Sequence, residues 1–252
     1  MHERFEIFFF ISGNVNYFIE KKVYQLKYGD LFVINNREIH KPSILSNEAY
    51  ERITVHFDPA ISQMFSTESC DLQKCFLDRP IGEKNKVSLN LDQTAEILGL
   101  FYRLGRLNQN PNPYNKMLKI SCFIELLVFI NKAFLRGDNL EEYMSIPGKL
   151  IPILDHIDEN LDSDLSLKRL GETFYIDRAY LSRLFKKSTG SNIHEYIIYK
   201  RISKAKQLIA EGYNATEACL QCGFNDYSNF SRTFKKTVGM SLRDYKKTIQ
   251  PW

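Results

Sequence analysis

The chain carries one sequence pattern twice, as DRAYLSRLFKKSTG over residues 177–190 and as DYSNFSRTFKKTVG over residues 226–239. The two copies are offset by 49 residues, and eight of the twenty positions from Asp177 to Tyr196 are identical in the second copy. Composition alone would produce roughly one or two identities over this length. The chain therefore contains two copies of one structural unit.

Each copy has the signals of a helix of about three turns. Asp177 and Asp226 can accept hydrogen bonds from the free N–H groups of a helix start, and Gly190 and Gly239 suit the left-handed residue that follows a helix end. Within each copy, apolar residues at helical spacing form one face, and polar and basic residues form the opposite face. The predicted buried residues are Leu181, Leu184 and Phe185 in the first copy and Phe230 and Phe234 in the second.

A shorter predicted helix precedes each of these helices. Ser166 is placed to cap residues 167–173, and Asn214 with Glu217 has capping-box spacing before residues 215–222. A short helix, a tight turn and a second helix with a basic outer face are typical of a helix-turn-helix. We call residues 166–190 the first unit and residues 214–239 the second unit.

A continuous helix is predicted over residues 195–210, between the two units. At 1.5 Å per residue it is about 24 Å long. Adding the half-widths of the flanking units places their second helices roughly one turn of B-DNA apart. This spacing predicts that one chain reads two successive segments of the major groove.

Charge is distributed unevenly along the chain. Residues 168–252 carry 16 basic and 7 acidic side chains, whereas residues 1–145 carry 17 and 18. A basic C-terminal part predicts a polyanionic partner, most simply nucleic acid, with a lysine-rich solvated surface as the alternative. Together with the spacing of the two units, it favours double-stranded DNA. Arg183 and Arg232 are the predicted base readers, because a guanidinium can donate two hydrogen bonds to guanine. The predicted phosphate contacts, for which surface solvation is again the alternative, are Lys186, Lys187, Lys200, Arg201, Lys204, Lys235 and Lys236.

Residues from about 150 to 245 resemble the DNA-binding domain of the AraC/XylS family of bacterial transcription regulators. The matching segments are LSLKRLGETFYIDRAYLSRLFKKSTG, RISKAKQLI and CGFNDYSNFSRTFKKTVG, followed by Tyr245. The resemblance implies two helix-turn-helix units on one linking helix, and RNA polymerase as a further partner. By position, it places base reading on Ala179, Ser182 and Arg183 in the first unit and on Tyr227, Ser228, Ser231 and Arg232 in the second, and we add the neighbouring Arg178.

The N-terminal part has a different pattern. Between residues 5 and 58, apolar residues alternate as they do in strands, and glycine and asparagine residues supply turns. Between residues 92 and 136 the apolar residues recur at helical spacing, in two segments separated by Pro111-Asn112-Pro113. This pattern predicts a small sheet or barrel followed by a helical hairpin.

The strand-rich part resembles the cupin-type sensor barrel of many such regulators, through FEIFFFISGNVNYFIE, YGDLFVINNREIHKP and YERITVHFDP. The resemblance implies a small-molecule effector, for which a sugar is one candidate, in a pocket that includes Glu6, Tyr17 and His40. We therefore expect an α+β fold: a cupin-like effector-binding barrel over residues 1–90, a dimerising hairpin over 91–136, a linker over 137–148 and the two-unit, all-α DNA-binding domain over 149–252.

A metal-binding cupin would use a His-x-His pair, a glutamate and a later histidine. Here His2 takes the place of the second histidine of that pair, before Glu6 and His40, and the first is absent. We therefore expect no metal, no cofactor and no catalytic residue, so that the protein is a regulator and not an enzyme. Two alternatives stay open: a metal-dependent cupin-type enzyme with an appended nucleic-acid-binding domain, and an effector-independent, constitutive regulator whose barrel only dimerises.

The second helix of the hairpin is apolar around most of its circumference. Such a helix must face the sheet domain and a further apolar surface. A second copy of the chain is the predicted partner, which makes the protein a homodimer. The alternative is a helix sandwiched within its own domain.

Two sequence features concern the cellular compartment. The longest nearly uncharged apolar stretch, residues 120–130, contains Glu125 and is shorter than the roughly 20 residues of a membrane span. The start of the chain has no export signal, and the five cysteines are sparse and odd in number, so we expect a cytoplasmic protein without membrane contact. We expect Cys219-x-x-Cys222 to be buried in a helix, with redox chemistry or half a zinc site as the alternative.

Overall fold

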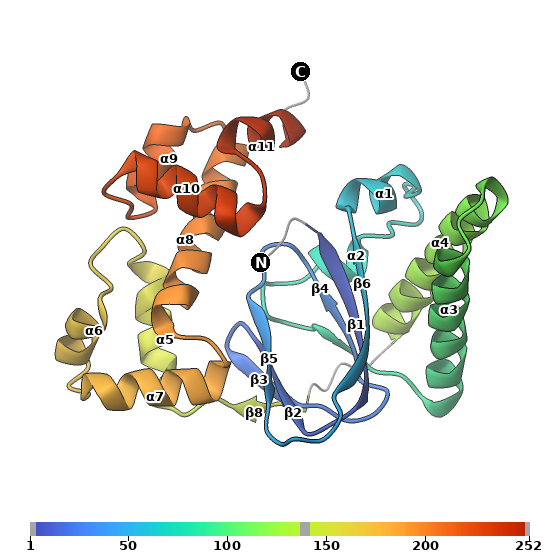
Figure 1. The fold of residues 1–252 in the computed structure, drawn as a ribbon, viewed down its shortest axis with the longest axis horizontal. Helices are drawn as coiled ribbons and strands as arrows, with labels where there is room; N and C mark the ends of the chain where they lie inside the picture. Colours follow the sequence, from blue (N-terminus) through green and yellow to red (C-terminus); the bar gives the residue numbers. More distant parts are fainter. Residues whose placement is uncertain (1–3, 137–141, 250–252) are drawn as a thin grey trace.

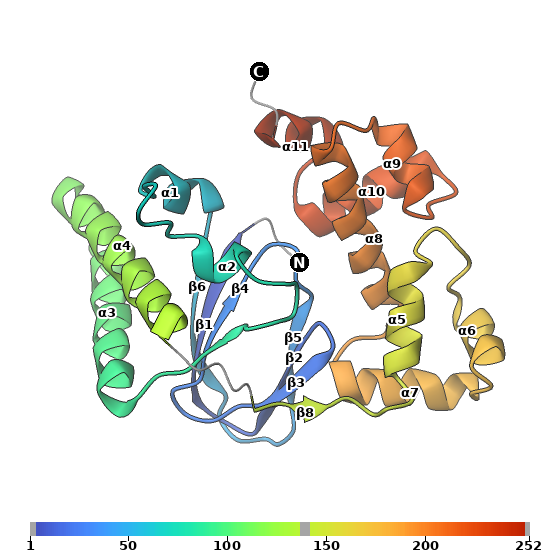
Figure 2. The ribbon, with the colours of Figure 1, turned by 180° about the vertical axis from the view of Figure 1, so that it is seen from behind.

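The computed structural model of the chain describes residues 4–136 and 142–249. His2 and the first part of the predicted linker, residues 137–141, lie outside the described residues. Figure 1 shows a central β-barrel with a helical hairpin on one side and the helical C-terminal part on the other, and Figure 2 shows the same arrangement from behind. The predicted α+β fold, with the barrel and hairpin first and two helix-turn-helix units last, is confirmed.

The barrel consists of two antiparallel sheets. Sheet A has the strand order β6-β1-β4-β7, and sheet B has the order β5-β2-β3-β8. In sheet A, Glu6 of β1 pairs with Ile34 on one side and with His56 on the other. The strands are β1 (Phe5–Ser12), β2 (Val15–Ile19), β3 (Lys22–Gln25), β4 (Leu31–Ile34), β5 (His40–Ile44), β6 (Glu51–Phe57), β7 (Lys86–Val87) and β8 (Met144–Ser145).

Aromatic rings fill the space between the two sheets. Phe8 of β1 stacks on Tyr17 of β2 with ring centroids 4.5 Å apart. Phe32 of β4 meets Tyr17 and Tyr24 edge to face, at 5.4 and 4.9 Å. All four side chains are at most 2% exposed, so the barrel interior is a packed core.

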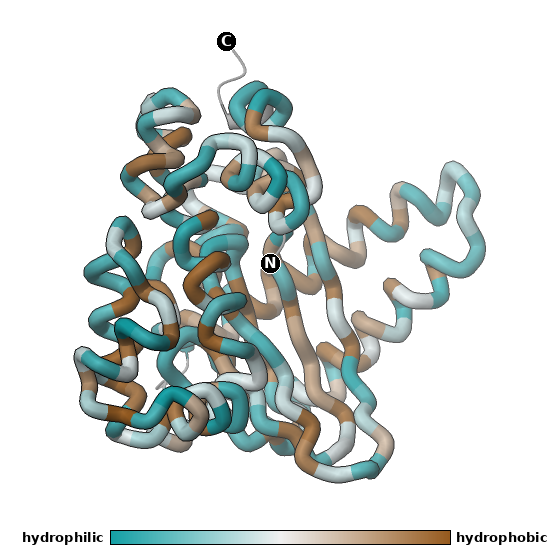
Figure 3. Tube along the Cα trace, turned by 60° about the vertical axis from the view of Figure 1, so that its left-hand side comes forward, coloured by the Kyte–Doolittle hydropathy of each residue, from teal (hydrophilic) through white to brown (hydrophobic). Residues whose placement is uncertain are grey.

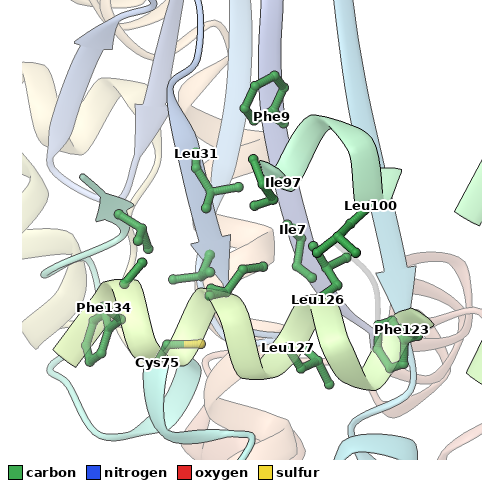
Figure 4. Close-up of a cluster of buried hydrophobic side chains, with 14 of the residues drawn as sticks. Ile7, Phe9, Leu31, Cys75, Ile97, Leu100, Phe123, Leu126, Leu127 and Phe134 are labelled. Carbon is green, nitrogen blue, oxygen red and sulfur yellow. The ribbon is translucent and has the colours of Figure 1, made fainter. Parts of the chain in front are cut away.

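The predicted hairpin forms from α3 (Leu91–Gln109) and α4 (Pro113–Arg136), after the short helices α1 (Pro59–Met64) and α2 (Lys74–Leu77). The hairpin covers the outer face of sheet A. Figure 4 shows Ile7 and Phe9 of β1 opposite side chains of α3 and α4, including Ile97, Leu100 and Leu126. The second half of α4 is thus sandwiched within its own domain.

The end of the hairpin behaves differently. Figure 3 shows its tip projecting away from the rest of the chain. Tyr114 and Met117 of α4 are 83% and 68% exposed there, and Tyr102 of α3 is 59% exposed. The sandwich explains the apolar residues of the second half of α4, but leaves these exposed ones without a buried role.

Part of the predicted linker belongs to the barrel. Met144 and Ser145 form β8, which pairs with Val23 and Lys22 of β3 and completes sheet B. The C-terminal helices follow directly. They are α5 (Ile151–Glu159), α6 (Leu167–Thr173), α7 (Arg178–Thr189), α8 (Ile193–Ala210), α9 (Ala215–Gln221), α10 (Tyr227–Val238) and α11 (Leu242–Ile249).

Two separate hydrophobic cores hold these helices. The helices α5, α6 and α7 and the start of α8 share their core with Phe18, Val23 and Ile39 of the barrel. The rest of α8 and the helices α9, α10 and α11 enclose a second core around Phe230 and Phe234. The first unit is therefore packed on the barrel, whereas the second unit is packed on its own helices.

Cys219 and Cys222 lie in the core of the second unit. Cys219 and Cys222 are free and buried, as predicted, and burial raises the pKa of the Cys222 thiol to about 12. A thiol with such a pKa is a poor nucleophile and metal ligand at neutral pH.

Within residues 4–136 and 142–249, no helix combines the length and the apolar character that a membrane crossing requires.

Candidate nucleic-acid interface and sensor site

The caps predicted for the duplicated helices are present. Asp177 accepts a hydrogen bond from the Tyr180 backbone N–H at 2.8 Å, and Asp226 accepts one from the Asn229 N–H at 2.7 Å. At the other ends, Gly190 and Gly239 are left-handed, with φ of 73° and 87°. Equivalent caps at both ends give α7 and α10 the same length of 12 residues.

The two helices lie at opposite ends of α8. Figure 1 shows α7 beside the N-terminal end of α8 and α10 beside its C-terminal half. An α-helix of the 18 residues of α8 is about 27 Å long. This length agrees with the spacing of two successive major-groove segments once the half-widths of α7 and α10 are added.

The predicted base-reading residues share the outer faces of these two helices. Ser182 and Ser231, at the centres of the two faces, are half-buried. The guanidinium of Arg232 also contacts its own helix, since its Nε lies 3.4 Å from the Ser228 carbonyl oxygen. The exposed members of the set are Arg178, Ala179, Arg183, Tyr227, Ser228 and Arg232.

The predicted phosphate contacts divide into two groups. Four lysines are exposed in the last turns of α7 and α10, and Lys204 of α8 is half-buried. The four exposed lysines lie beyond the predicted base-reading residues along the same two helices. The four exposed lysines are Lys186, Lys187, Lys235 and Lys236.

Lys200 and Arg201, also predicted phosphate contacts, are bound to protein groups in this structure. The Nζ of Lys200 lies 2.6 Å from a Glu20 carboxylate oxygen and 3.1 Å from an Asp158 oxygen, and its side chain is only 15% exposed. Arg201 donates hydrogen bonds to backbone carbonyl oxygens. Neither cation is presented on the outer faces of α7 and α10, because Lys200 binds the barrel and Arg201 binds the loop that precedes the first unit.

A polar cluster lies where β1, β2, β5 and β6 meet. Glu6, Tyr17 and His40, predicted from the sequence to share a pocket, are in contact: the Tyr17 hydroxyl lies 3.3 Å from Glu6 Oε1, and His40 Nε2 lies 3.1 Å from Glu6 Oε2. His56 adds a fourth group, with its Nε2 2.9 Å from the same Oε2. The exposed fraction rises from 7% for the Glu6 side chain to 39% for His56, so the cluster opens to solvent on the His56 side.

The environment raises the pKa values of two of these groups. Burial, with the nearby charge of Glu6, raises the pKa of Tyr17 well above its usual value, so its hydroxyl donates the hydrogen bond to Glu6. Burial alone would lower the pKa of His40, but the hydrogen bond and the charge of Glu6 outweigh it and raise that pKa. The cluster thus offers carboxylate, imidazole and hydroxyl groups at one site.

Sequence reasoning missed His56. The signal was present in the quoted segment YERITVHFDP, where His56 alternates with Val55 and Phe57 on a predicted strand. The side chains of Val55 and Phe57 pack toward the hairpin, so His56 lies on the other face of the strand. Only the pairing of β1 with β6 sets His56 directly across from Glu6. Strand pairing between residues 50 positions apart is not encoded in the local pattern.

Two family models match the chain. Residues 1–127 match the AraC-like ligand binding domain, and residues 170–248 match a helix-turn-helix domain. The first match alone covers half of the 252 residues. The chain belongs to the AraC family.

Relatives of this AraC-family chain are named as transcriptional regulators. An uncharacterised helix-turn-helix-type regulator of Staphylococcus aureus is 24% identical over 94% of this chain and 31% of its own length. The probable transcriptional regulator LumQ of Photobacterium leiognathi is 33% identical over 40% of this chain and 41% of its length. The transcriptional activator RhaS of Salmonella schwarzengrund is 26% identical over 62% of this chain and 54% of its length. The chain therefore spans between about a third and a half of the length of these curated relatives.

Two solved structures of bacterial proteins are also similar to this chain. The C-terminal domain of AraT, a response regulator from Geobacillus stearothermophilus, has 25% identity and a TM-score of 0.40, over 41% of this chain and 87% of that domain. ToxT from Vibrio cholerae has 16% identity and a TM-score of 0.38, over 97% of this chain and 90% of that protein.

The AraC family organisation corresponds to the two sites described above. The polar cluster of Glu6, Tyr17, His40 and His56 lies inside the segment that matches the ligand binding domain. The outer faces of α7 and α10 lie inside the segment that matches the helix-turn-helix domain. The AraC-type chain thus separates a candidate sensor site from a candidate DNA-binding surface.

Proposed function

We propose that the chain is a sequence-specific DNA-binding transcription regulator that places α7 and α10 in two successive segments of the major groove. The observation that carries this proposal is the pair of equally long, identically capped helices at the two ends of α8. Their outer faces combine guanidinium, hydroxyl and small side chains with lysines in the last turns. Such faces suit base contacts near the start of a recognition helix and phosphate contacts beyond it.

Arg183 and Arg232 carry the expected specificity. Each is exposed on the outer face of its helix, where a guanidinium can donate to both the O6 and the N7 atoms of guanine. Replacing either by alanine is expected to cost about 1–3 kcal/mol on the specific site and to relax discrimination at one base pair. Titration of labelled duplexes that vary at each position measures both effects.

Lys186→Ala is the matched control for Arg183→Ala, because it removes one positive charge from the same exposed helix. It is expected to weaken binding to specific and random duplexes equally and to reduce the slope of affinity against salt. Equal losses on specific and random DNA for both arginine variants would contradict base reading. They would leave the arginines with a phosphate role.

We propose that the cluster of Glu6, Tyr17, His40 and His56 binds a small, hydroxyl-rich effector such as a sugar. Carboxylate and imidazole groups that meet within 3.3 Å offer several hydrogen-bond acceptors and donors to one ligand. His56, whose side chain is 39% exposed, is the member of the cluster that a ligand in solution reaches first. Because rings fill the barrel below, the ligand is expected at the His56 side and not deep in the barrel.

A panel of sugars and small polar metabolites tests this site by thermal unfolding of the whole chain. A true effector is expected to raise the melting temperature of the wild-type chain, since ligand that binds only the folded state stabilises it. Glu6→Gln should abolish the shift, because the amide cannot accept in place of both carboxylate oxygens. A shift that survives in Glu6→Gln would place the ligand elsewhere.

The exposed end of the hairpin supports a homodimer. Tyr114 and Met117 are more than half exposed at the start of α4, where the hairpin projects from the fold, and Tyr102 is more than half exposed further back on α3. Large exposed apolar side chains on one hairpin suit an association surface. Light scattering tests the dimer, with an expected mass near twice 29.5 kDa.

RNA polymerase is the further partner that we propose for a regulator of this kind.

A further inference from the structure

We propose that Arg201 and Gly223 are positioning residues that fix the spacing between α7 and α10, which we call the two recognition helices. They meet the loop between α5 and α6 at one place, which we call the spacing junction and define as Leu161, Ser163, Arg201 and Gly223. This inference rests on the proposed function, because spacing matters only if both helices enter DNA. It assigns Arg201 a role other than the phosphate contact expected from the sequence.

Arg201 ties the middle of α8 to the α5–α6 loop. Its Nε donates to the Leu161 carbonyl oxygen at 2.9 Å, and one of its terminal nitrogens donates to the Ser163 carbonyl oxygen at 2.8 Å. The guanidinium also lies 5.9 Å from the centre of the Phe224 ring, in the turn that precedes α10. One side chain of α8 thus contacts the loop that precedes the first unit and the turn of the second unit.

Gly223 brings that turn against the same loop. Its φ is 73°, and a Cβ atom built on it would lie 2.2 Å from the Leu161 carbonyl oxygen and 2.9 Å from a terminal nitrogen of Arg201. Both distances are shorter than non-bonded atoms allow, and the first involves backbone. Any side chain at residue 223 must therefore push the turn before α10 away from the loop before α6.

The junction matters because the units have separate cores. The first unit packs with the barrel, the second around Phe230 and Phe234, and α8 runs through both. Long helices bend. From Arg201 to Ala210, the last residue of α8, is about 13.5 Å at 1.5 Å per residue, so a pivot of roughly 14° at Arg201 would move the C-terminal end of α8 and the helices packed on it by about 3 Å. That displacement is close to the 3.4 Å rise of one base pair. The contacts of Arg201 and Gly223 with the α5–α6 loop therefore hold α10 at a constant separation from α7.

Selection from a library of random-sequence duplexes tests this inference, because it needs no known operator. The full chain is bound to the library, and the retained duplexes are sequenced. The wild type is expected to retain two short motifs at one separation, close to one helical turn. Gly223→Ala and Arg201→Ala are expected to retain the same two motifs, with separations one base pair shorter and longer rising to comparable frequency.

Two further variants make the result specific to the junction. Gly212→Ala is the matched control for Gly223→Ala, since Gly212 also has a positive φ, of 100°, but open space where its Cβ would lie; it should keep the single separation. Arg201→Lys keeps the charge but loses the two-pronged donor geometry. It should spread the separations as Arg201→Ala does while leaving the salt slope unchanged, whereas a phosphate contact would survive this exchange.

The outcomes distinguish a failure of the positioning role from a failure of the proposed DNA-binding function. If the wild type retains no paired motif, the proposed reading of two groove segments is wrong. If the wild type keeps one separation and both Arg201 variants keep it too, the positioning role is wrong and the function stands. Circular dichroism identifies a Gly223→Ala chain that fails to fold, and in that case the Arg201→Lys result decides.

Discussion

The first and second units share a sequence pattern but differ in what they are attached to. The first unit buries Phe185 in a core that includes Phe18 and Ile39 of the barrel. The second unit buries the equivalent Phe234 among α8, α9, α10 and α11 alone. Duplication therefore preserved the helices and their caps, whereas the surroundings made one copy part of the sensor body and left the other as its extension.

This difference gives the two recognition helices different freedom. A change in the barrel reaches α7 directly through a common core and through the contacts of α7 with β5. The same change reaches α10 along α8, at the spacing junction. It also reaches α8 through the hydrogen bond from Lys206 to the Asn36 carbonyl oxygen, which is 3.0 Å long. We expect the barrel to control where the first helix points and the junction to control where the second one follows.

The matched pair Phe185→Ala and Phe234→Ala is expected to lower the free energy of unfolding more than any other change proposed for the chain. Both side chains are 0% exposed, and removing a buried phenylalanine costs about 3–5 kcal/mol. Phe185→Ala is expected to lower hydrogen-exchange protection in the barrel as well as in α7. Phe234→Ala is expected to lower protection in α9, α10 and α11 and to leave the barrel amides unchanged.

Hydrogen exchange measured by mass spectrometry on both variants tests whether the two cores unfold independently. Wild-type chain under the same conditions is the reference, and the two variants control for each other, because they remove the same side chain from equivalent positions. Loss of barrel protection in Phe234→Ala would show that the two cores unfold as one. The units would then differ in position but not in coupling.

Local signals explain how much the sequence could predict. Asp177, Gly190, Asp226 and Gly239 cap their helices as expected, because a cap depends on residues within one turn of it. The strand region and the hairpin were predicted for the same reason: alternation and helical spacing are read over a few residues. At the candidate sensor site, Glu6, Tyr17 and His40 were identified by resemblance, and the structure brings them together.

Contacts between distant segments explain what the sequence could not predict. Lys200 carries the charge expected of a phosphate contact, yet Glu20, 180 residues earlier, holds it in the interface with the barrel. Met144 and Ser145 look like linker residues and become a strand only because β3 offers them an open edge. Arg201 and Gly223 meet through a loop 40 residues before Arg201. In each case the partner is set by the tertiary fold and not by the neighbouring residues.

The smallest expected effect is a pH dependence that distinguishes the two units. The pKa of His40 is raised by Glu6 against the opposing effect of burial, so between its ordinary value and the raised one the folded chain binds more protons than the unfolded chain. The free energy of unfolding must then fall as pH rises through this window. His40 contributes its full stabilisation below about pH 6.5 and loses it above the raised pKa, with a slope of at most about 1.4 kcal/mol per pH unit for one group.

His40→Gln removes this titration, so the variant should lose the part of the slope that His40 supplies. Denaturant unfolding at a series of pH values, on the wild-type chain and the variant, measures it. Since His40 begins β5 and β5 contacts α7, exchange protection of α7 should follow pH in the wild type, while that of α10 should not. An identical slope in His40→Gln would mean that Glu6 does not hold the charged imidazole. A response of α10 equal to that of α7 would mean that the barrel controls both recognition helices alike.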